Sequence, residues 1–71
     1  MNLFKIAEQQ QIQTMLKEIR EMPIQTRQVV TMSMEGLSYS EIADACGISD
    51  SNVGVILNRA RKVLMESIQH V

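Results

Sequence analysis

The chain has 71 residues, of which 45% are hydrophobic and 3% aromatic, and seven Lys and Arg against eight Asp and Glu give a net charge of −1. A chain of this length forms one small domain that buries only about 60% of its unfolded surface, so we expect modest stability. It has no apolar run near the roughly 18 residues of a membrane span, no signal-peptide core and only one Cys, which predicts a cytoplasmic protein without membrane association or disulfide.

The residue pattern predicts an all-α fold in a single domain over residues 1–71. Few aromatic residues and few β-branched runs suit packed helices better than a sheet. Residues 1–11 are expected to form a short N-terminal lead that is either frayed or helical. A first helix should then end near Glu21, because apolar residues recur at helical spacing at Ile12, Met15, Leu16 and Ile19.

Pro23 is expected to close the first helix and open the second, because its missing amide hydrogen costs nothing at a first helical position. The second helix should run to about Glu35 and stop at Gly36. Arg27 in this helix is compatible with a phosphate contact and equally with a salt bridge that anchors the helix. Core filling is favoured for three methionines at helical spacings, Met15, Met32 and Met34.

A capping box marks the start of a third helix. Ser38 stands three residues before Glu41, so hydroxyl and carboxylate can each satisfy a free backbone amide. The helix should run about eight residues, with Ile42, Ala43 and Cys46 on its inner side. Cys46 is therefore predicted to be a small core residue rather than a redox or metal-binding residue.

Gly47 joins this helix to the last one with the spacing of a helix-turn-helix. Glycine accepts the left-handed conformation that a tight turn needs, and Ser49 or Asp50 can cap the next helix. The stripe at i, i+4, i+7 and i+11 that predicts the buried face of the last helix consists of Val53, Leu57, Ala60 and Leu64. The opposite face is mostly polar and partly basic, and it holds Ser51, Val55, Asn58, Arg59 and Lys62, with Asn52 beside them.

This outward face suits the major groove of DNA. The second helix of a helix-turn-helix lies in that groove with its N-terminal part near base edges, so small hydrogen-bonding residues early and cations later make geometric sense. An ordinary solvated face on a three-helix packing unit is the alternative interpretation. The net charge indicates weak binding, because neutralising about three or four phosphates gives a salt slope of only roughly −3.

Short motifs along the chain extend this interpretation. They are Pro23 with Arg27 four positions on, Glu35-Gly36-Leu37-Ser38-Tyr39, Glu41-Ile42-Ala43, Gly47-Ile48-Ser49, Asn52-Val53-Gly54-Val55 and Arg59-Ala60-Arg61. Together they resemble region four of bacterial RNA polymerase sigma factors of the extracytoplasmic-function group, over about Leu16 to Ile68. The helix-turn-helix of two-component response regulators shares some steps, but Asn58-Arg59-Ala60-Arg61-Lys62 favours the sigma assignment. The resemblance implies a four-helix domain that grips the minus-thirty-five promoter element and docks on the β-flap of the RNA polymerase core.

We therefore predict promoter DNA binding in transcription initiation. The residues expected to approach bases are Ser51, Asn52, Val55, Asn58 and Arg59. The residues expected to contact phosphates are Ser38, Tyr39, Ser40, Arg61 and Lys62. Capping alone explains Ser38 equally well, packing against the neighbouring helix is as good a role for Tyr39, and Arg61 has an alternative pairing with an acidic group such as Asp44.

Departures from the sigma pattern keep a second function open. Relatives often carry Arg or Lys where this chain has Gly54, Val55 or Ile56, so the groove-facing helix lacks several cations. Gly54 also costs about 1 kcal/mol relative to Ala inside a helix, which close approach of the backbone to DNA or to a partner would offset. Because Val55 is an apolar residue on an outward face, the alternative is a sigma-like protein-interaction module, held for example by an anti-sigma factor, with weak or no DNA binding.

Enzymatic activity has little support in the sequence. It contains no nucleophile, base and acid set, no glycine-rich phosphate loop and no metal-ligand spacing, so we predict no catalytic residues, no cofactor and no metal site. The resemblance covers only the promoter-binding region of a sigma factor. We therefore expect that the chain does not initiate transcription alone and is either an excised domain or an accessory protein.

Overall fold

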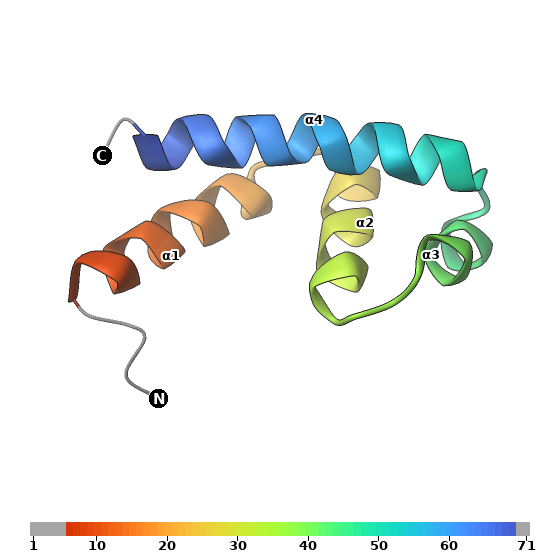
Figure 1. Cartoon of the computed structure of the whole chain (residues 1–71), viewed down its shortest axis with the longest axis horizontal. Helices are drawn as coiled ribbons and strands as arrows, with labels where there is room; N and C mark the ends of the chain where they lie inside the picture. Colours follow the sequence, from red (N-terminus) through yellow and green to blue (C-terminus); the bar gives the residue numbers. More distant parts are fainter. Residues whose placement is uncertain (1–5, 70–71) are drawn as a thin grey trace.

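Four α-helices joined by short turns make up residues 6–69, the part of the chain that the computed structural model describes. They are α1 (Ile6–Arg20), α2 (Ile24–Met34), α3 (Tyr39–Cys46) and α4 (Asp50–Gln69), shown in Figure 1. The predicted all-α fold with four helices is confirmed. In the expected N-terminal lead, residues 6–11 belong to α1, while residues 1–5 lie outside the described part.

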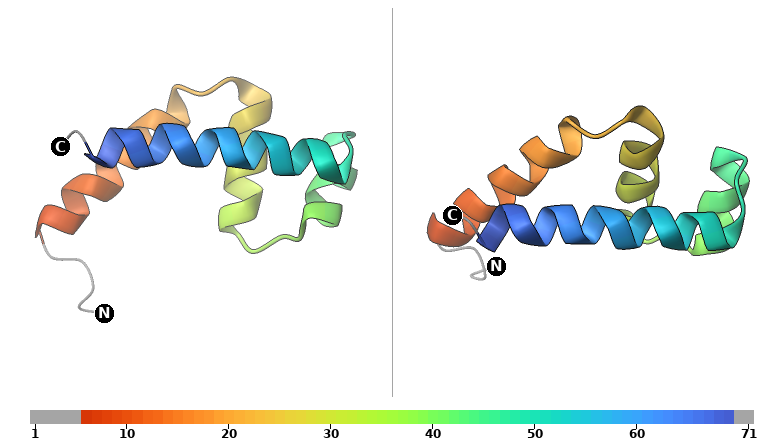
Figure 2. Two further views of the ribbon diagram at one scale, coloured as in Figure 1. Left: turned by 45° about the horizontal axis from the view of Figure 1, so that its top comes forward. Right: turned by 90° about the horizontal axis from the view of Figure 1, so that it is seen from above.

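The long helix α4 organises the other three. Its 20 residues span about 30 Å, at about 1.5 Å per residue. Helix α1 packs along its C-terminal half, α2 meets its middle, and α3 lies at its N-terminal end, as Figures 1 and 2 show from three directions. All three partners lie on one side of α4, so its other side faces solvent.

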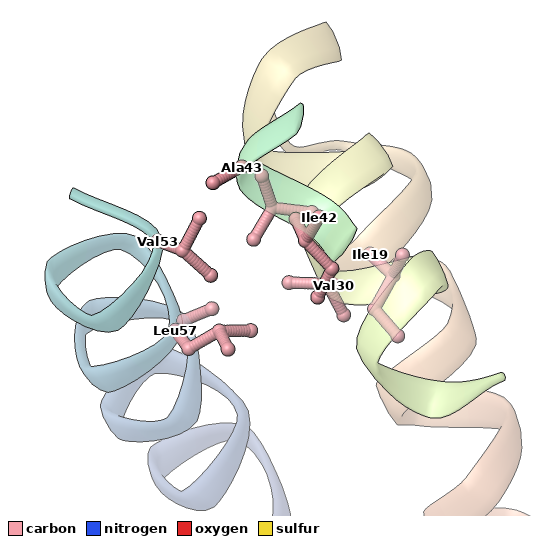
Figure 3. Packing of buried hydrophobic residues seen from close by; sticks show 8 residues of the cluster. Ile19, Val30, Ile42, Ala43, Val53 and Leu57 are labelled. Atoms are coloured by element: carbon pink, nitrogen blue, oxygen red, sulfur yellow. The ribbon is translucent and has the colours of Figure 1, made fainter. Parts of the chain in front are cut away.

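The core is formed by eight apolar side chains from all four helices: Ile19, Val29, Val30, Ile42, Ala43, Val53, Leu57 and Ala60. Figure 3 shows Val53 and Leu57 of α4 directed toward Ile42 of α3 and Val30 of α2. The predicted buried stripe of the last helix is therefore confirmed, and its fourth member, Leu64, is half-buried against the core. This stripe fixes which face of α4 is left outward.

Helix α3 begins and ends as its sequence predicts. The Glu41 amide donates to Ser38 Oγ at 3.1 Å, and the Ser38 amide donates to Glu41 Oε1 at 2.8 Å, which is the complete capping box. Gly47 adopts the left-handed conformation at φ 69°. The amide of Ile48 then donates to the carbonyl oxygen of Ala43 at 3.1 Å and closes the helix end.

The three methionines do not all lie in the core as predicted. Met15 and Met32 are half-buried, and Met32 Sδ lies 4.0 Å from Cys46 Sγ, which places the half-buried Cys46 against the core. Met34 is 63% exposed, so its assignment as core filler is wrong. Met34 is the last residue of α2, where the chain turns away at Gly36 with φ 93°, and helical spacing alone does not reveal that this end is open.

Arg27 anchors α2 to the end of α1. Its Nη1 donates to the carbonyl oxygen of Arg20 at 3.2 Å. Arg20 is the last residue of α1, and the last carbonyls of a helix have no amide partner within it. The half-buried Arg27 thus makes an anchoring contact, but with the main chain rather than through the salt bridge that was one of its two expected roles.

Candidate nucleic-acid interface

Helices α3 and α4 form a helix-turn-helix with a sharp corner at Gly47. Three residues separate the helices, and Ile48 in the middle of the turn is half-buried against the core. Ser49 caps α4, because its Oγ accepts a hydrogen bond from the Asn52 amide at 3.1 Å. Of the two expected caps, Ser49 therefore has this role, and Asp50 occupies the first turn, where its charge complements the helix dipole.

The outward face of α4 carries six of the ten residues predicted to contact DNA, five at bases and Lys62 at a phosphate. All six of its members are exposed: Ser51, Asn52, Val55, Asn58, Arg59 and Lys62. Val53, Leu57 and Ala60 on the opposite face are buried. The face therefore begins at the first turn of the helix with small polar groups and continues with cations two to three turns later, which is the order that a groove-inserted helix uses.

Tyr39 connects the start of α3 to this helix. A Cβ atom placed on Gly54 would lie 3.4 Å from Cε2 of Tyr39, so the Tyr39 ring rests on the bare backbone of α4 at Gly54. Packing against the neighbouring helix, one of the two roles expected for Tyr39, is therefore present. The ring is still 43% exposed, so one side of it remains accessible beside the outward face.

A carboxylate of the chain itself, that of Glu41, already occupies the N-terminal end of α3. The Glu41 carboxylate accepts from the Ser38 amide, which is one of the groups that a phosphate would use at this helix end. Ser38 Oγ accepts from the Glu41 amide, so the capping role of Ser38 is present. Tyr39 and Ser40, the two residues that follow Ser38 and were also predicted to contact phosphate, are both exposed.

Arg61 lies at the edge of the outward face. Its Nη1 donates to Oδ1 of Asn58, one turn earlier in α4, at 3.3 Å. From the sequence we expected this arginine to contact a phosphate or to pair with Asp44, and the contact with Asn58 was not predicted. Because both residues belong to the predicted DNA-binding set, the structure joins a base-reading candidate to a phosphate-contacting one.

A second surface, which the sequence did not predict, lies between α1, α2 and α4. It is a groove of about 160 Å³ lined by Met15, Val30, Ser33, Met34, Leu57, Ala60, Arg61 and Leu64. Its lining is mostly apolar, and the exposed Met34 stands at its edge. The only sequence signal was the run of methionines at helical spacings, which suits a core equally well.

Within residues 6–69, no three His, Cys, Asp or Glu side chains lie together as metal ligands would. None of the helices in the same range combines the length and the apolar character needed to cross a membrane.

Comparison with known proteins identifies the family. The family model of sigma-70 region 4 matches residues 10–64, which is most of the chain. No curated protein and no solved structure shows significant similarity to this chain. The matched range contains α2, α3 and the helix-turn-helix corner, together with the outward face of α4. The chain therefore belongs to the sigma-70 region 4 family, helix-turn-helix domains that bind DNA in transcription initiation and work with RNA polymerase.

Proposed function

We propose that this domain binds the minus-thirty-five promoter element through the outward face of α4 while its apolar groove docks on the β-flap of RNA polymerase. The observation that carries the proposal is the division of α4 into a buried stripe and an exposed polar stripe directly after the Gly47 corner. The resemblance to the extracytoplasmic-function group makes a promoter of that class the expected target.

The geometry suits insertion of the first half of α4 into the major groove. The groove is about 12 Å wide, so only part of a helix about 30 Å long lies near base edges. Ser51, Asn52 and Val55 belong to the first two turns, with Asn58 and Arg59 one turn further along. In the proposal these five approach bases, and Val55 meets a thymine methyl group.

Phosphate contacts come from the flanks of this face. Arg61 and Lys62 are exposed on the fourth turn of α4, and Tyr39 and Ser40 lie at the start of α3. The Glu41 carboxylate repels a phosphate at that helix start, so we place the contribution of Ser38 in the capping of α3 together with weak phosphate contact.

Docking on polymerase adds to the weak affinity that the DNA contacts provide. With three cations on α4, Arg59, Arg61 and Lys62, the electrostatic part of binding is small. Tethering to a large partner turns DNA binding into an intramolecular step at high effective concentration. The apolar groove beside Met34 is the surface that we assign to the β-flap. We also propose that the domain acts in the cytoplasm, where polymerase and promoter DNA are found.

A sigma-like interaction module, held by an anti-sigma factor, is the second candidate function. The observation in its favour is apolar exposure on α4, where Val55, Val63 and Met65 are each more than two-fifths exposed. An anti-sigma partner that covered Val55 would block the outward face and the promoter together.

Two reciprocal variants test the proposal. Val55→Glu places a negative charge on the outward face and should abolish binding to DNA selected from a random pool, with β-flap binding unchanged. Met34→Glu places the same charge at the groove and should abolish β-flap binding, with DNA binding unchanged. Lys17→Ala on α1 serves as a control for charge loss elsewhere, and thermal unfolding verifies that each variant is folded.

Arg59→Ala adds a test of one residue, and unchanged DNA affinity in this variant would remove its assigned role. If the parent does not bind DNA at about 50 mM salt, where electrostatic binding is strongest, yet captures an anti-sigma protein tightly, the interaction module is the better function.

A further inference from the structure

The hydrogen bond between Arg61 and Asn58 influences which hydrogen-bonding groups Asn58 offers to DNA. Arg61 Nη1 and Asn58 Oδ1 are 3.3 Å apart on successive turns of α4. A guanidinium carries only donors, so it must face the carbonyl oxygen of the amide and not its NH₂ group. The contact therefore determines the orientation of the Asn58 amide as well as its position.

Arg61 also borders the apolar groove. Its side chain lines the apolar groove beside Leu57 and Leu64, where the aliphatic stem of an arginine can pack. A stem held there loses part of its rotamer freedom before it meets Asn58, and residues three apart on a helix are neighbours. Both features favour the Arg61–Asn58 contact over a freely moving exposed pair.

A free asparagine reads adenine in the major groove by two bonds at once. Its NH₂ group donates to N7, and its oxygen accepts from the N6 amino group. Arg61 takes up one of the two lone pairs of Asn58 Oδ1 and holds its positive charge beside the other. This charge disfavours an approaching amino group, so Asn58 presents chiefly its NH₂ donors. Donors match the acceptors O6 and N7 of guanine or O4 of thymine, and they oppose the amino groups of adenine and cytosine.

We propose that Arg61 is a positioning residue that makes Asn58 act chiefly as a hydrogen-bond donor, selecting a keto base, guanine or thymine, on the strand it contacts. The inference rests on the proposed function, because it assumes that α4 enters the major groove. It assigns Arg61 a role in base selection in addition to its phosphate contact.

The test is base preference measured by selection from a random double-stranded DNA pool with the full chain. Asn58→Ala first identifies the base position that Asn58 reads, as the position where preference disappears. At that position the parent should favour guanine or thymine over adenine on the order of tenfold, the discrimination of a good base contact. Arg61→Met keeps an apolar stem for the groove but frees Oδ1, so tolerance for adenine should rise by a similar factor.

Two controls separate positioning from charge and from folding. Lys62→Met removes an adjacent positive charge and should weaken binding to all sequences while leaving the keto preference unchanged. Arg61→Met combined with Asn58→Ala should show no change in base preference beyond that of Asn58→Ala alone.

The outcomes are distinct. A keto preference that collapses in Arg61→Met and survives in Lys62→Met supports the inference. An adenine preference in the parent, an unchanged preference in Arg61→Met, or no position that depends on Asn58 overturns it while promoter binding stands. Absence of DNA binding by the parent at low salt overturns the proposed function, and this inference with it.

Discussion

Gly54 of α4 lies beneath the ring of Tyr39, with 3.4 Å between Tyr39 Cε2 and the position that a Cβ atom on Gly54 would take. From the sequence we expected the cost of a glycine inside this helix to be offset by a contact of its backbone with DNA or with a partner. The structure provides a contact within the domain, from a residue at the start of α3. Gly54 also lies on the flank of α4 rather than on its outward face, since it is half-buried whereas Val55, the next residue, is exposed.

We predict that Gly54→Ala stabilises the domain. A distance of 3.4 Å is ordinary van der Waals contact, so the methyl group fits under the Tyr39 ring. The gain is about 1 kcal/mol from helix propensity, which corresponds to a rise in Tm of roughly 4–8 °C for a domain of this size. Thermal unfolding measures it, and a lower Tm would mean that the ring cannot accommodate the methyl group.

Ser38→Ala should destabilise the domain by about 1 kcal/mol. The variant removes the hydroxyl that accepts from the Glu41 amide and leaves the first turn of α3 without its cap. Ser40→Ala is the matched control, because Ser40 is an exposed residue of the same type two positions on. Denaturant unfolding of both variants measures the difference. Equal stability would assign Ser38 to something other than capping.

Ile42→Ala should remove a large part of the domain's stability. Ile42 is fully buried at the centre of the core, and such truncations cost about 2–5 kcal/mol. A small domain has a total stability of only about 5 kcal/mol or slightly more. Ile24→Ala, with Ile24 65% exposed on α2, is the control and should be close to neutral. Thermal unfolding followed by circular dichroism measures the stability of both variants, and a Tm of Ile42→Ala equal to that of the parent would contradict the assigned core.

Lys62→Ala should lower the salt dependence of DNA binding. Each phosphate contact contributes roughly one unit to the slope of log affinity against log salt, so the slope should fall from about −3 to about −2. Lys17→Ala removes the same charge from α1, away from the outward face, and should leave the slope near that of the parent. Affinity measured at several salt concentrations gives the slopes, and equal slopes for the two variants would place Lys62 outside the interface.

The sequence predicts those parts of the fold that depend on neighbours along the chain. The capping box of Ser38 with Glu41 and the turn at Gly47 need only residues three or four apart. The buried stripe from Val53 to Leu64 follows from helical periodicity. These local features are enough to place the outward face of α4.

Other features depend on how helices meet in space. Met34 and Val30 share one face of α2, yet Val30 is buried and Met34 is exposed, because Met34 is the last residue of that helix and stands at the edge of the groove. The contact of Arg27 with the Arg20 carbonyl depends on the angle between α1 and α2. Several polar residues lie near Arg61 along the sequence, so the sequence alone could not show that Arg61 contacts Asn58.

The unbroken course of α4 from Asp50 to Gln69 has a mechanical consequence. Its first turns follow the Gly47 corner, and its later turns support the groove, so both surfaces are mounted on one stiff rod. A protein seated at Met34 and a duplex seated at Val55 would then keep a fixed mutual orientation, with no hinge between them to absorb strain. If promoter DNA met the domain at another angle relative to the docked partner, the DNA would have to bend, because α4 is a continuous helix that does not.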